Sequence, residues 1–179
     1  MALHSSTTSL IREAMSEYLD IAHHCITNGK PTGGCFGFPA TLLLFCIVDA
    51  IGSYYRGNSS FVVMIDGKSK SIDGDGSKHY RILNSPCYYK MDLSEKDIKR
   101  VYNHYRCLLS HNAALPMNHA LRIGKHTDPV FFRDNNSNIS GVNLIPFYNV
   151  SVQAVSKFLS VAPTIIPKSR QAKGISHKK

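Results

Sequence analysis

The chain has 179 residues, 43% of them apolar, which suits one domain with a hydrophobic core and excludes a wholly disordered protein. Five cysteines without a CxxC pair predict free, buried thiols in a reducing compartment. The N-terminus lacks a signal-peptide pattern, and the longest apolar run, 36–48, is too short to span a bilayer. We therefore expect a soluble cytoplasmic protein without a membrane partner.

The formal net charge is +9, and five positive side chains fall in an acid-free stretch that begins at Lys168. Without them the count is 9 − 5 = +4 on the remainder. Such a stretch either aids solubility or attracts a phosphate backbone non-specifically, and composition leaves both open. We expect residues 1–166 to form a single domain and residues 167–179 to be a disordered basic tail.

Apolar residues at helical spacing predict a first amphipathic helix over residues 9–26, ended by Asn28-Gly29 and Pro31. Pro39 suits the first turn of a second helix, because its missing N–H has no helical partner there. This second helix should reach about Tyr55. It is apolar nearly all round, so we expect it to be the most buried element.

Residues 61–65 followed by Asp66-Gly67 predict a strand and a tight turn, but the polar run 68–71 is a poor partner strand. Residues 73–76 resemble part of a calcium loop. Lys78, however, stands where an EF-hand requires Gly, so a mobile loop is the better interpretation. A short helix is expected over residues 79–83.

The clearest helix signal begins at Ser94, an N-cap residue. Glu95 and Asp97 follow in the first turn, where acidic groups favour the helix dipole. One face then carries a regular apolar series that leads to Asn112. The helix should end before Pro116.

Residues 121–123 and 130–132 predict a two-stranded ribbon, 135–138 a turn, and 148–162 a last helix ended by Pro163. The predicted fold is therefore mainly α. We expect an up-and-down bundle of four or five helices with small β-ribbon insertions.

Arg106 and His111 stand five residues apart near the end of the helix that starts at Ser94. A guanidinium can hold a phosphate by two parallel hydrogen bonds, and an imidazole can transfer a proton near neutral pH. In an ideal α-helix the two residues are about 7.5 Å apart along the axis and roughly 140° apart around it. They converge only if the helix unwinds or a second copy completes the site.

The stretch VYNHYRCLLSHNAA (101–114) resembles the R-x(4–6)-H motif helix of the HEPN superfamily. The resemblance implies a helical bundle that often acts as a metal-independent endoribonuclease in toxin–antitoxin and phage-defence systems. It also implies a homodimer with two motif copies in one cleft. Active members commonly carry a polar residue directly after the arginine, where this chain has Cys107. The alternative is therefore a non-catalytic module that binds a nucleotide or a protein.

The resemblance implies that Arg106 binds the scissile phosphate of RNA and that His111 is the general acid or base. Other polar residues on the motif helix are candidate auxiliaries: Tyr102, Asn103, Ser110 and Asn112. Asp49, the only acid in the apolar second helix, is a candidate ion-pair partner of Arg106.

No histidine or cysteine spacing suits zinc, and no Gly-rich phosphate loop is present, so we expect neither a metal nor another cofactor. The runs Tyr54-Tyr55-Arg56 and Tyr88-Tyr89-Lys90 suit either core packing or stacking on bases. An antitoxin or other protein partner is a further expectation. The RNA substrate is not encoded in any recognisable motif.

Overall fold

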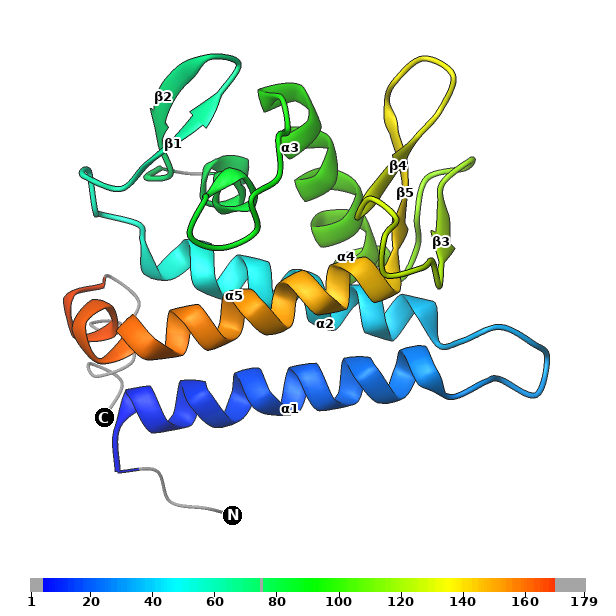
Figure 1. Ribbon diagram of the computed structural model, residues 1–179, viewed down its shortest axis with the longest axis horizontal. Coiled ribbons are helices and arrows are strands. Elements are labelled where there is room, and N and C mark those ends of the chain that lie inside the picture. Colours follow the sequence, from blue (N-terminus) through cyan, green and yellow to red (C-terminus); the bar gives the residue numbers. More distant parts are fainter. Residues whose placement is uncertain (1–4, 75, 170–179) are drawn as a thin grey trace.

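Three long helices form the base of the molecule in a computed structural model, which describes residues 5–74 and 76–169 (Figure 1). They are α1 (Thr7–Thr27), α2 (Gly37–Tyr54) and α5 (Leu144–Ile165). Helices α1 and α2 are antiparallel, whereas α5 runs in the same direction as α2 (Figure 1). The fold is mainly α, as predicted.

Local sequence explains where the first two helices begin. The Ser6 hydroxyl accepts the backbone N–H of Ser9, and the Ser9 side chain returns the bond, which forms a capping box for α1. Pro39 lies in the first turn of α2, as expected. The middle of α2 is fully buried, including Leu44, Phe45 and Val48, so the prediction of a central helix is confirmed.

Helix α5 is longer than predicted at both ends. It starts at Leu144 rather than near residue 148, with Pro146 in its first turn, and it continues through Pro163 to Ile165. Proline in a first turn lacks only an N–H that has no helical partner. Pro163 lies in the last turn, near where the helix gives way to the short 3₁₀ segment η3 (Ile166–Lys168).

By length and composition alone, α2 and the stretch Leu144–Lys168 could each cross a membrane. The run 36–48 alone was judged too short to span a bilayer, but the whole of α2 is long and apolar enough to do so. Half of the α2 window is buried inside the molecule, and a core helix of a soluble protein has the same properties.

The second layer contains shorter elements (Figure 1). Strands β1 (Val62–Ile65) and β2 (Lys68–Ser71) pair antiparallel, so the expectation that 68–71 is a poor partner strand is wrong. Asp66 and Gly67 both have positive φ, 50° and 70°, as a tight hairpin turn requires, and this turn sets the pairing despite the polar strand. The 3₁₀ helix η1 (Gly76–Asn84) follows; Asp75 lies outside the described residues.

The helix predicted from Ser94 is present in three parts: α3 (Glu95–Val101), a π-helical segment η2 (Tyr102–Leu108) and α4 (Leu109–Asn112). Ser94 and Asp97 form the capping box. Ala113, with φ of 49°, ends the helix.

The predicted ribbon is a three-stranded sheet of order β3–β5–β4. Strands β3 (Ala120–Arg122) and β4 (Phe131–Arg133) do not pair with each other, because β5 (Ile139–Asn143) lies between them. The expected turn at 135–138 is present as the link from β4 to β5. Bidentate hydrogen bonds from Arg133 to Asp97, at 3.1 and 3.0 Å, tie this sheet to the start of α3.

Phe45 connects the two layers. Its ring packs against those of Tyr80 in η1, Tyr105 in η2 and Phe147 in α5, with centroids 6.2, 5.5 and 4.8 Å away. The layers therefore share one continuous aromatic core. The basic tail predicted for 167–179 lies mostly outside the described residues; Lys168 ends the short helix η3 and Ser169 is buried.

Candidate functional site

Arg106 lies on the π-helical segment of the motif helix. In a π-helix the backbone bonds span five residues rather than four, and such turns occur frequently at functional sites. The wide turn places Tyr102 and Arg106 toward the same neighbours. The ring of Tyr102 packs edge-on against His79, with centroids 5.7 Å apart, and Arg106 faces Asp49, to which His79 is hydrogen-bonded.

The expected ion pair between Arg106 and Asp49 is present. Nε of Arg106 lies 3.7 Å from Oδ1 of Asp49, and the two side chains are 32% and 30% exposed. The terminal nitrogens of Arg106 make no hydrogen bond to any residue in the described part of the chain. Asp49 therefore holds the Nε side of the guanidinium in place. The two terminal nitrogens remain available to bind an anion through two parallel hydrogen bonds.

Asp49 also receives a hydrogen bond from His79, and this bond belongs to a longer chain. Nε2 of His79 lies 2.6 Å from Oδ1 of Asp49, and a terminal nitrogen of Arg56 lies 2.7 Å from Nδ1 of His79. A guanidinium only donates and a carboxylate only accepts. The two contacts are consistent with a His79 ring that accepts at Nδ1 and donates at Nε2.

Close packing of α2 against η1 makes this network possible. A Cβ added at Gly52 would lie 2.2 Å from the backbone oxygen of His79, so only glycine fits there. Gly52 is three residues after Asp49, on the same side of the helix. The approach of η1 brings His79, which is 2% exposed, directly onto the Asp49 carboxylate.

The charge on Asp49 is favoured despite its burial. Partial burial raises the pKa of the carboxyl, but the hydrogen bond and charge interaction of His79, followed by the charges of Arg106 and Arg56, together lower it by more. The net pKa lies below the ordinary value of 3.8. Asp49 is therefore an anion at neutral pH and keeps Arg106 oriented.

The remaining residues of the π segment have other partners. Burial and then the nearby Cys107 raise the pKa of Tyr102, so the thiol that follows the arginine lies beside Tyr102. Nδ1 of His104 lies 3.0 Å from Nε2 of His119. Burial, then His119 and then Arg100 lower the pKa of His104. Asn103 is exposed and makes no hydrogen bond among the described residues.

The three polar residues at the end of the motif helix, Ser110, His111 and Asn112, are all exposed. No hydrogen bond or ion pair links any of them to Arg106 or to another described residue. Neither Arg106 nor His111 is among the residues that line the main cavities. A single chain thus brings together Arg106, Asp49 and Tyr102 but does not join His111 to them.

Sequence reasoning missed two members of the network, Arg56 and His79. Arg56 had been considered only beside its two tyrosines, and those tyrosine runs are core residues: Tyr54, Tyr55, Tyr88 and Tyr89 are at most 9% exposed. An acid inside an apolar helix requires a donor from another segment, and Gly52 marks where that segment approaches. These two features were the available signal for His79.

No group of three or more potential metal-binding side chains exists within residues 5–74 and 76–169. Comparisons of the chain with protein-family models, with curated proteins and with solved structures find no match.

Proposed function

We propose that the protein is a metal-independent endoribonuclease of HEPN type that acts as a homodimer. The observation that carries the proposal is the half-anchored guanidinium of Arg106. Asp49 holds its Nε side, and its two terminal nitrogens have no partner among the described residues. This arrangement is suited to binding a phosphate in a fixed orientation without a metal.

In the proposed reaction, Arg106 binds the scissile phosphate and stabilises the negative charge that develops on its oxygens. The 2′-hydroxyl attacks phosphorus and loses its proton to a general base. The bond to the 5′-oxygen breaks, and that oxygen receives a proton from a general acid. His111 fills one of these two proton-transfer roles. The products are a 2′,3′-cyclic phosphate and a 5′-hydroxyl end.

The position of His111 supports a site shared between two copies. His111 is exposed and has no partner among the described residues, and neither Arg106 nor His111 lines any of the four main cavities. We place Arg106 of one chain opposite His111 of a second copy, with the motif helices facing each other in an up-and-down HEPN bundle. Ser110, Asn112 and Asn103 would then border the shared cleft.

The proposal extends to biological setting through the superfamily resemblance alone. A cytoplasmic toxin or phage-defence effector, held inactive by an antitoxin or another protein, is the setting that the resemblance favours. The formal charge of +9 supports RNA as the partner, because a basic protein attracts a phosphate backbone.

One observation favours the second candidate, a non-catalytic HEPN-like module that binds a nucleotide or a protein. Asp49 already offsets the charge of Arg106 within one chain, and Cys107 occupies the position that is commonly polar in active members. In this alternative, Arg106 stabilises the packing of η2 on α2, and the exposed end of the motif helix is a contact surface.

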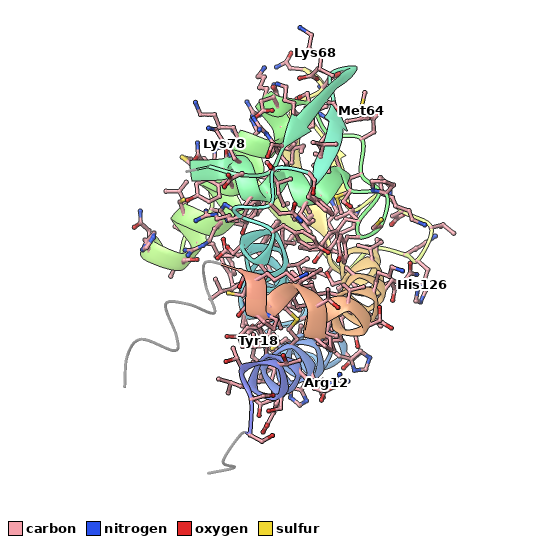
Figure 2. All side chains as sticks on the ribbon, turned by 90° about the vertical axis from the view of Figure 1, so that its left-hand side faces the viewer. Arg12, Tyr18, Met64, Lys68, Lys78 and His126 are labelled. Atoms are coloured by element: carbon pink, nitrogen blue, oxygen red, sulfur yellow. The ribbon has the colours of Figure 1, made fainter. Side chains whose placement is uncertain are left out.

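Nuclease assays with EDTA present separate the two candidates. The wild-type protein should cleave RNA, and Arg106→Ala and His111→Ala should each lose roughly 10²–10⁴-fold in rate while retaining their fold and dimeric state. Arg12→Ala is the matched control, because Arg12 projects from α1 into solvent (Figure 2) and its loss removes the same charge. Cleavage that survives both substitutions rules out the Arg106–His111 site, and no cleavage by the wild type rules out the nuclease.

A further inference from the structure

A cavity of about 350 Å³ lies where α2 and α5 end. Figure 2 looks onto this end of the molecule, with Lys68 and Lys78 projecting from the hairpin and η1. The cavity is bordered by the side chains of Arg56, Asn58, Thr164 and Lys168. Its size is within the range of small-ligand sites, and its described lining contains no acid.

The polar groups of this cavity are mainly donors. Oδ1 of Asn58 already accepts bonds from the backbone N–H and hydroxyl of Ser60, at 3.2 and 2.6 Å, so its amide N–H groups remain available. Nε of Arg56 is buried without a partner in the described part of the chain. Lys168 is exposed and forms no ion pair with another described residue. A donor-rich cavity with two cations suits an anion.

The charges of the hydrogen-bonded network next to the cavity also favour an anionic ligand. Arg56 and Arg106 contribute two positive charges and Asp49 one negative charge, so the sum over these three residues is 2 − 1 = +1. Lys168 adds one more at the cavity. Asp73, which accepts a bond from the Gly57 N–H at 2.9 Å, does not line the cavity. Among the residues of the network and the cavity lining, positive charges therefore outnumber negative ones, although Asp49 and Asp73 lie nearby.

From these contacts we infer that the cavity binds the phosphate group of a small phosphorylated molecule through Arg56, Lys168 and the amide of Asn58. The inference goes beyond RNA cleavage and does not depend on it. Free polyphosphate and a nucleotide share this chemistry, and they differ in whether a base and sugar also fill the cavity.

The same contacts connect the cavity to Arg106. Arg56 reaches Nδ1 of His79, His79 reaches Asp49, and Asp49 lies against Arg106. A phosphate on Arg56 competes with His79 for its donors. Loss of that donor leaves Nδ1 of His79 without its partner and allows the ring to shift its hydrogen bond to Asp49. Ligand occupancy is thus transmitted to Arg106 through two hydrogen bonds and one ion pair.

Binding can be measured by calorimetry with inorganic pyrophosphate and with adenosine monophosphate as probes. We expect saturable binding of at least one probe, abolished in Arg56→Gln and weakened by roughly threefold to tenfold in Lys168→Gln. Lys157→Gln, an exposed lysine of α5 outside the cavity, should bind as the wild type does. Binding of pyrophosphate alone identifies a free polyphosphate ligand, and tighter binding of the monophosphate identifies a nucleotide.

No saturable binding of either probe, or equal affinities in Lys168→Gln and Lys157→Gln, would overturn the site. The connection to Arg106 has its own readout, the imidazole nitrogen signals of His79 in NMR spectra. Probe binding should shift the Nδ1 signal of His79 in the wild type and in the cleavage-deficient His111→Ala variant. A bound probe that leaves the His79 signals unchanged refutes the connection, whether or not the protein cleaves RNA.

Discussion

Arg106 and His111 stand five residues apart on one helix but in opposite surroundings. Arg106 lies on a π-helical turn, held by Asp49, which is held in turn by His79 and Arg56. His111 lies in the last turn, exposed and without a partner among the described residues. The described part of the chain therefore orients the Arg106 guanidinium but not the His111 ring, which in the proposed function is positioned by a second copy.

The largest expected difference between the two regions is in the free energy of unfolding, because the Arg106 region is anchored in the core and the His111 region is not. Tyr105, one residue before Arg106, is fully buried and stacks on Phe45. Tyr105→Ala should lower the free energy of unfolding by about 3–5 kcal/mol, because it leaves a large cavity in the core. His111→Ala should change it by less than about 0.5 kcal/mol, since His111 is exposed. Urea denaturation measures both.

Tyr105→Phe is the matched control. The Tyr105 hydroxyl is buried without a hydrogen-bond partner in the described part of the chain, so its removal should change stability by less than about 1 kcal/mol or increase it. If Tyr105→Ala and Tyr105→Phe destabilise equally, the ring is not what anchors the π segment.

A smaller effect is expected when the network loses its one anion. Asp49→Asn leaves Arg106 and Arg56 without a counter-charge and should lower stability by about 1 kcal/mol, a modest value because Asp49 is 30% exposed. Asp92→Asn, an exposed acid without an ion pair among the described residues, should change stability by less than about 0.5 kcal/mol. Equal effects of the two substitutions would mean that Asp49 does not hold Arg106.

The smallest effect concerns pH. The folded protein keeps the pKa of Asp49 below its ordinary value of 3.8. The carboxylate thus contributes stability that is fully present above that pH and is lost as pH falls through the lower folded-state pKa. The difference in unfolding free energy between wild type and Asp49→Asn should be constant from about pH 6 to pH 4 and shrink below it. A difference that does not shrink as pH falls below about 4 would contradict the ionic role.

Sequence patterns predicted the helices well where the deciding interactions are local. Ser94 and Asp97 mark the start of α3, and Pro39 marks the first turn of α2, whereas the Ser6 cap of α1 was not anticipated. Strand β2 was misjudged because its composition is polar, whereas its pairing is set by the positive φ angles of the turn at Asp66 and Gly67. Strand β5 was missed because its pairing with β3 and β4 is a long-range property.

The candidate site was predictable only in part for the same reason. The pairing of Asp49 with Arg106 follows from an acid in an apolar helix that must find a cation. The π-helical turn has no Gly or Pro to announce it and depends on how Tyr102 and Tyr105 pack against His79 and Phe45. The contact of Arg56 with this network could not be predicted from the sequence, because it is the packing of η1 that brings His79 between Arg56 and Asp49.

The most direct test of the central claim, a site shared between two copies, is a mixed dimer. Arg106→Ala and His111→Ala chains carrying different tags can be co-expressed and the heterodimer purified. If Arg106 of one copy works with His111 of the other, one of the two symmetric sites keeps both groups. The heterodimer should then recover about half of the wild-type cleavage rate. A purified heterodimer no more active than either variant homodimer would contradict the account.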